Sequence, residues 1–288
     1  MSNSIRVLTD STADLSVETA QRLGIRILPL HFSLEGEDYC DDGTLDRSCF
    51  YQRLAQSGEM PQTAAPGVGE ILTFYEELVT EGAEDIIAIF LANSLSSTQA
   101  NAQLAARELG GARVHLLESG QISRGLGFLV QAAAEALARG ATVVEVKELV
   151  IALRQRTYII GVLDTLEYLK RSGRVSWVTA QLGQWLKVKP LIAFHAGEAR
   201  LWGRVRTRRR ARAWLLRQVA EAGPLERLVL LHSGLAEESW MALHEAMQPY
   251  APCGQLPVVE VNPIFGTHIG PQGVGVAWVQ AEGAGKVW

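Results

Sequence analysis

Ile86-Ile87-Ala88-Ile89-Phe90 is a short, uninterrupted run of apolar residues. Such a run is typical of a β-strand that is buried on both faces. Ser96 opens an Ala- and Leu-rich helix after it, and Val114 to Leu117 is an expected strand. Before it, Ile5 to Thr9 predicts another strand. The alternation of strands and helices predicts a parallel sheet with helices on both faces.

In the rest of the first half, one more strand is expected at 25–32. Helices are expected at 16–23, 46–56, 67–80, 122–139 and 143–156. The second half has a different pattern of elements. Gly197-Glu198 lies between two expected strands and predicts a hairpin. Its expected elements are strands at 158–163, 190–194, 199–205, 228–231, 258–261 and 274–279, and a helix at 208–222. We therefore predict two α/β domains, residues 1–155 with a parallel sheet and residues 156–288 with a mixed sheet.

Composition narrows the class of protein. A chain of 288 residues is long enough for two domains, and 48% apolar with 20% charged residues is ordinary for a globular protein. Neither a signal peptide nor an apolar run of roughly 18–20 residues is present, so we expect no integral membrane segment. Cys40, Cys49 and Cys253 form no CxxC pair. This pattern favours reduced thiols in a cytoplasm and no metal site.

The sequence lacks the motifs of several common enzyme classes. The chain lacks a P-loop, an H-E-x-x-H pair and a G-x-S-x-G elbow, and no G-x-G-x-x-G follows the first strand. The net charge of −4 gives no sign of nucleic-acid binding. Nucleotide, zinc and serine-hydrolase functions therefore have little support.

Three polar loops are expected where strands end or helices begin: Thr9 to Thr12, Gln62 to Gly67 and Asn93 to Thr98. Free N–H groups and hydroxyls at a helix start bind anions well. The same residue types also cap helices without any ligand, and for Asp10 both roles stay open. Three such loops on one edge of a sheet favour a site for a small anionic head group.

Two segments carry a sharper signal. Residues 164–176 read Asp-Thr-Leu-Glu-Tyr-Leu-Lys-Arg-Ser-Gly-Arg-Val-Ser, and residues 266–271 read Gly-Thr-His-Ile-Gly-Pro. They are similar to the D-T-L-E-Y-L-K-x-G-G-R-I-S and G-T-H-x-G-P segments of the DegV family, which binds fatty acids. Residues 9–15, 185–190 and 205–208 match further segments in the family's order. The chain thus resembles that family from residue 7 to about residue 278.

The resemblance implies a bacterial protein that buries a long-chain fatty acid in a cleft between two domains and needs no cofactor. It implies no catalysis by this chain itself. A separate ATP-dependent kinase subunit phosphorylates the exposed carboxylate, and the acyl phosphate feeds phospholipid metabolism. Thr63 matches the threonine that binds the carboxylate, with Asn93 and Ser96 expected beside it, and Arg174 and His268 match a basic pair at the head-group rim. Ala64, Ala65 and Asn93 depart from the family's pattern.

Six arginines lie within the nine residues 204–212. Cations at a helix N-terminus are slightly unfavourable, so we predict that Arg206, Arg208 and Arg209 form a partner surface rather than a solvated helical face. Two other functions stay open. One is a stand-alone enzyme that acts on a small anionic substrate with His268 as acid or base. The other is RNA binding through the arginines, although no aromatic stripe accompanies them.

Overall fold

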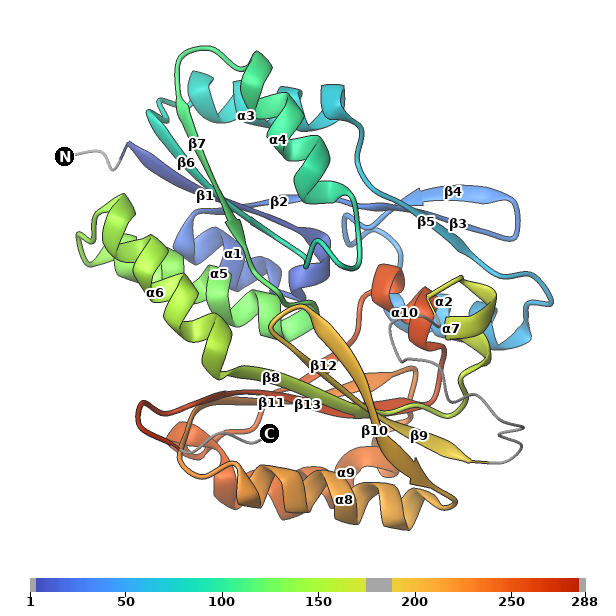
Figure 1. The fold of residues 1–288 in the computed structure, drawn as a ribbon. Helices are drawn as coiled ribbons and strands as arrows, with labels where there is room; N and C mark the ends of the chain where they lie inside the picture. The colour runs from blue at the N-terminus through green and yellow to red at the C-terminus, as the bar shows by residue number, and fades with distance from the viewer. Residues whose placement is uncertain (1–3, 175–187, 285–288) are drawn as a thin grey trace.

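A computed structural model describes residues 4–174 and 188–284. Its first sheet is parallel, with the order β2-β1-β6-β7. The strands are β1 (Ile5–Asp10), β2 (Ile25–Leu28), β6 (Asp85–Phe90) and β7 (Arg113–Glu118). Every residue of β6 is buried, as its apolar run predicts. The predicted parallel sheet with helices on both faces is confirmed (Figure 1).

Five helices accompany this sheet: α1 (Val17–Leu23), α3 (Val68–Thr80), α4 (Thr98–Glu108), α5 (Ser123–Ala138) and α6 (Val143–Arg156). α3 and α4 cover one face, where Ile71 and Ala102 pack in the same core as Ile86. α1 and α5 cover the other face, where Leu126 packs in the same core as Ile87 (Figure 1).

The second sheet is mixed, with the order β10-β9-β8-β13-β11-β12. Its strands are β8 (Thr157–Val162), β9 (Lys189–His195), β10 (Glu198–Val205), β11 (Leu225–Ser233), β12 (Val258–Glu260) and β13 (Gly273–Gln280). β9 and β10 form the expected hairpin, and β12 runs parallel to β11. α8 (Arg208–Glu221) and α9 (Glu237–Met247) cover its outer face, while α5 and α6 lie against its inner face (Figure 1). α5 thus lies between the two sheets.

A third, small antiparallel sheet consists of β3 (His31–Leu34), β4 (Glu37–Cys40) and β5 (Gln62–Ala64). The prediction of one strand over 25–32 was wrong, because β2 ends at Leu28 and β3 belongs to this other sheet. Pro29 follows β2, and proline has no N–H to continue the ladder of hydrogen bonds.

The remaining elements are short: α2 (Arg47–Gln56), α7 (Glu167–Arg171), α10 (Pro263–Ile269) and the 3-10 turns η1 (Ser11–Ala13), η3 (Gln248–Tyr250) and η4 (Pro252–Gly254). Although α2 belongs to the first half of the chain, it packs on α10 of the second half. The division of the chain at residue 155 stays a prediction. It falls beside the junction between Arg156, which ends α6, and Thr157, which begins β8.

No helix in the described part of the chain combines the length and apolar character that a bilayer span needs.

Candidate functional site

An apolar cavity lies against the inner face of the mixed sheet, where the two halves of the chain meet. Leu95 and Ile122 of the first half contribute to its wall. The other apolar lining residues come from the second half, and they include Ile159, Leu163, Leu169, Ile192, Phe194, Leu231, Val261, Phe265 and Ile269. A space lined in this way favours a hydrocarbon ligand over a polar one.

Two glycines make room for this cavity. Gly161 of β8 is paired with Gly275 of β13, and both line the space. Cross-strand partners point to the same face of a sheet, so the pair removes two side chains from one spot on the cavity wall. A Cβ on Gly275 would come within 2.6 Å of the Ile160 carbonyl oxygen, whereas one on Gly161 has its nearest neighbour at 3.6 Å. Gly161 is therefore the position where a side chain fits.

A polar cluster lies beside the apolar cavity. Thr63 of β5 and His268 of α10 are joined by a hydrogen bond of 3.0 Å between Oγ1 and Nε2. Arg174, just after α7, is near enough to affect the protonation of His268. Ile269 follows His268 directly and lines the cavity. The structure thus brings together three predicted site residues from distant parts of the chain, next to the apolar space.

His268 is not a cation in this cluster. Burial, helped by the positive charge of Arg174, lowers its pKa from 6.5 to about 4. The imidazole is therefore neutral near pH 7, and it acts as a hydrogen-bonding group rather than as half of a basic pair. Arg174 supplies the positive charge of the cluster, held in part by a 2.8 Å hydrogen bond from its Nη1 to the Ser172 carbonyl.

Asn93 and Ser96 lie in the loop that leads into α4. The Asn93 N–H faces the Glu118 carboxylate at 3.3 Å, and the Ser96 hydroxyl accepts a hydrogen bond from the Thr98 N–H at 3.2 Å. The loop reaches the cavity through Leu95. The contact of Asn93 and Ser96 with a carboxylate stays a prediction.

The arginine cluster divides into two kinds of residue. Arg206 and Arg209 are exposed. Arg208 is half-exposed, and its Nη2 donates a 2.9 Å hydrogen bond to the Gln272 side chain, in the loop that follows α10. Arg208 therefore also has a local structural role, which the sequence pattern did not indicate.

Asp10 caps η1, which is one of the two roles that the sequence left open. Its carboxylate accepts hydrogen bonds from the Thr12 N–H at 2.9 Å and the Leu91 N–H at 2.7 Å. The residue is fully buried, and burial raises its pKa to about 6. It holds the end of β1 to the end of β6.

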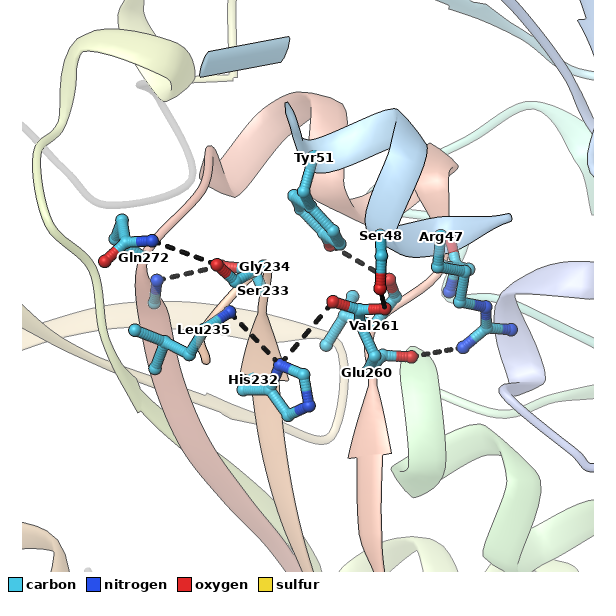
Figure 2. A network of polar contacts seen from close by, with 12 residues as sticks. Arg47, Ser48, Tyr51, His232, Ser233, Gly234, Leu235, Glu260, Val261 and Gln272 are labelled. Atoms are coloured by element: carbon cyan, nitrogen blue, oxygen red, sulfur yellow. Dashed lines mark hydrogen bonds and ion pairs between the residues drawn. The ribbon is translucent and has the colours of Figure 1, made fainter. Parts of the chain in front are cut away.

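No motif in the sequence pointed to the residues that dock α2 beside the cavity (Figure 2). The Tyr51 hydroxyl donates to the Val261 carbonyl at 2.9 Å, and Arg47 donates to the Glu260 carbonyl. The Glu260 carboxylate lies between Ser48, at 3.3 Å, and His232, at 3.7 Å. Because His232 and Val261 also line the cavity, these contacts fix one of its walls.

Asp41 provides a pH-dependent contribution to stability near this junction. Burial raises its pKa to about 7, against the lowering effects of a Ser11 hydrogen bond and Arg47. Between about pH 4 and pH 7 the folded protein therefore holds a proton that the unfolded chain releases, and the free energy of unfolding rises as the pH falls. We expect Asp41→Asn to be more stable than the parent by about 1–2 kcal/mol at pH 8 and close to it at pH 5.

Urea unfolding at the two pH values measures this difference. Asp42→Asn is the matched control, because hydrogen bonds from Thr44 lower the pKa of Asp42. Its substitution should lower stability at pH 8. Equal effects of the two substitutions at pH 8 would contradict the prediction.

The fold and this site define an α/β protein with two large sheets, an apolar cavity and a polar cluster at its side. The sequence profile of the DegV family, whose members are described as uncharacterised proteins, matches residues 4–281. This chain belongs to the DegV family.

Relatives and solved structures agree with this membership. A DegV domain-containing protein of Staphylococcus aureus strain N315 is 30% identical over 279 residues, covering 96% of this chain and 97% of the relative. A fatty-acid-binding DegV family protein from Thermus thermophilus superposes with a TM-score of 0.87 at 30% identity, covering 96% of this chain and 99% of that one. DegV of Bacillus subtilis, a fatty acid binding protein, gives a TM-score of 0.85 at 26% identity, with coverage of 96% and 99%.

Proposed function

We propose that this protein binds one long-chain fatty acid, with the acyl chain in the apolar cavity and the carboxylate at the cluster of Thr63, His268 and Arg174. The observation that carries the proposal is the position of this cluster beside the cavity that Ile269 and Leu169 help to line. A hydrocarbon tail gains roughly 0.8 kcal/mol for each CH₂ that leaves water, and the carboxylate needs donors and a positive charge. The fatty-acid binding of the Thermus and Bacillus proteins supports it.

The cavity has to widen on binding. Its free space in this structure is about 80 Å³, and pockets for organic ligands commonly measure roughly 300–1,000 Å³. Native mass spectrometry with organic extraction tests the proposal directly. One acyl chain per protein supports it, and protein that is empty and takes up neither palmitate nor oleate contradicts it.

Thr63→Val is expected to weaken binding at least tenfold. The substitution keeps the shape of the side chain and removes the hydroxyl, and one hydrogen bond to a charged group contributes roughly 1.5–3 kcal/mol. Isothermal titration with oleate measures the effect. Thr80→Val serves as control, because the Thr80 hydroxyl bonds only its own helix, at the Glu76 carbonyl. Equal affinities for Thr63→Val and Thr80→Val would remove Thr63 from the site.

We further propose that the protein presents the carboxylate, in the cytoplasm, to a separate ATP-dependent kinase subunit. The exposed arginines Arg206 and Arg209 suit this role, because a basic rim attracts an anionic nucleotide and its protein. Salt should slow such an encounter. Acyl-phosphate formation without any kinase subunit would instead support a stand-alone enzyme.

The double variant Arg206→Ala/Arg209→Ala should keep its fatty acid and lose most acyl-phosphate formation with a matching kinase, by tenfold or more at low salt. The measurement is a reconstituted phosphorylation assay beside lipid extraction of the same preparations. Arg217→Ala is the control, since Arg217 lies on the same helix as Arg209 and pairs with Glu221. If the double variant matches Arg217→Ala, the cluster is a solvated face.

A further inference from the structure

A hollow of about 440 Å³ lies on the outer face of the small sheet. Along the three strands of this sheet, successive side chains point to opposite faces. The backbone pairing places His31 opposite both Cys40 and Ala64. Side chains of paired residues point to the same face, so Cys40 and His31 face outward together. Thr63 is paired with Phe32 and faces the other way, toward His268. Thr63 also borders the hollow, but its hydroxyl and the side chains of Cys40 and His31 lie on opposite faces of the small sheet.

Three side chains form a relay in this hollow. The Cys40 thiol lies 3.2 Å from Nδ1 of His31, and Nε2 of the same ring lies 2.9 Å from the Glu70 carboxylate of α3. A carboxylate only accepts hydrogen bonds, so the Nε2–H of a neutral imidazole points to Glu70 and Nδ1 is left to accept the thiol proton. A nucleophile, a base and a group that orients the base are thus within hydrogen-bonding reach.

Metal binding does not fit this arrangement. The sulfur and the carboxylate lie on opposite nitrogens of one imidazole ring, so they cannot converge on a single ion. Cys40 is exposed, and partial burial with the charges of Asp42 and Glu70 raises its pKa. The thiol therefore rests protonated, and attack on an electrophile requires a base to take its proton.

We propose that Cys40 is a nucleophilic thiol, with His31 as its base and Glu70 as the orienting group, and that it reacts with small uncharged electrophiles of the peroxide class. His31 takes the thiol proton, and the sulfur attacks one oxygen of hydrogen peroxide. The O–O bond breaks, and the leaving hydroxide takes the proton from His31 to become water. Sulfur is oxidised by two electrons to sulfenic acid, and the peroxide is reduced.

The charges around the hollow select this class of reagent. Asp38 lines it, and Glu70 and Asp42 are close to the thiol, so anionic electrophiles such as acyl phosphates are repelled. Among the residues that the structure describes, those that line the hollow include neither lysine nor arginine. Acyl transfer, which develops negative charge on a carbonyl oxygen, would lack a charged donor there. Peroxide is neutral, and its leaving group is neutralised by the proton from His31.

The experiment treats the full-length protein with hydrogen peroxide, traps sulfenic acid with dimedone and measures the adduct at each cysteine by mass spectrometry. Cys40 should react at least tenfold faster than Cys49, which is also exposed. His31→Gln and Glu70→Gln should bring Cys40 down to the rate of Cys49. Glu148→Gln, at an exposed carboxylate of α6 outside the hollow, should leave the rate unchanged.

The bound fatty acid, measured in the same samples, should not change in any of these variants, which keeps this test independent of the proposed lipid site. Equal rates at Cys40 and Cys49 in the parent protein overturn the proposal. So does an unchanged Cys40 rate in Glu70→Gln, the milder substitution, when circular dichroism shows the parent fold.

Discussion

Gly161→Leu is expected to reduce fatty-acid affinity by roughly 100-fold and to leave the protein folded. Gly161 lines the cavity, and a Cβ there meets ordinary van der Waals distances. A leucine side chain occupies the space of about four methylenes, and displacing them costs about 3 kcal/mol of burial. The measurement is oleate binding by titration, together with the acyl content of the purified variant.

Gly203→Leu is the matched control, because Gly203 is also a strand glycine with room for a Cβ, 3.8 Å from Leu191, and lies on β10 away from the cavity wall. It should bind oleate like the parent. Wild-type affinity in a folded Gly161→Leu protein would show that the acyl chain lies elsewhere.

Asp14→Ala is expected to lower the free energy of unfolding by about 3 kcal/mol. The Asp14 carboxylate is buried and forms an ion pair with the Arg47 guanidinium at 2.8 Å. It also accepts hydrogen bonds from the Ser123 hydroxyl at 2.6 Å and the Asn262 N–H at 3.1 Å. One side chain thus joins the loop after η1 to α2, α5 and the start of α10. Its removal leaves the buried Ser123 hydroxyl and Asn262 N–H, and the partly exposed Arg47 guanidinium, without this acceptor.

Chemical denaturation measures this loss, and two further variants interpret it. Asp14 has a positive φ of 51°, a conformation that asparagine tolerates better than alanine. Asp14→Asn should therefore lose less stability, since it keeps the backbone preference and one acceptor oxygen. Asp38→Ala, at an exposed aspartate, should change stability by less than about 0.5 kcal/mol. Equal losses for Asp14→Ala and Asp38→Ala would show that the buried contacts contribute nothing.

The sequence predicted the long elements well because their patterns are local. The buried run of β6 and the Ala-rich helices each have enough apolar residues to show their period. Short elements failed for physical reasons. α10 contains Gly266 and Thr267, which are poor helix formers, and its start depends on the Asn262 cap with Pro263 at the first turn. Gly266 is needed for packing, since a Cβ there would lie 2.9 Å from Cζ of Tyr51.

The candidate site was predictable only in part. Thr63 and His268 are 205 residues apart, and no periodicity connects them, so only the resemblance to a family placed them together. The neutral state of His268 depends on burial beside Arg174, which a sequence does not show. The apolar cavity is built from residues that are individually ordinary core residues. Val175 and Ser176 of one matching segment, and residues 185–187 of another, lie outside the described part of the chain.

The position of α5 limits how a ligand enters. This helix contacts β1 and β6 on one side and β8 and β13 on the other, and twelve of its sixteen residues are buried. A hinge motion that separates the two sheets would remove α5 from one of them and expose the apolar surface of α5 to water. Loading of the proposed fatty acid is therefore expected to occur by local displacement of α7 and α10, which contribute Leu169 and Ile269 to the cavity wall. On the proposed function, the two sheets would then act as one fixed frame, and exchange of a lipid would leave their relative orientation unchanged.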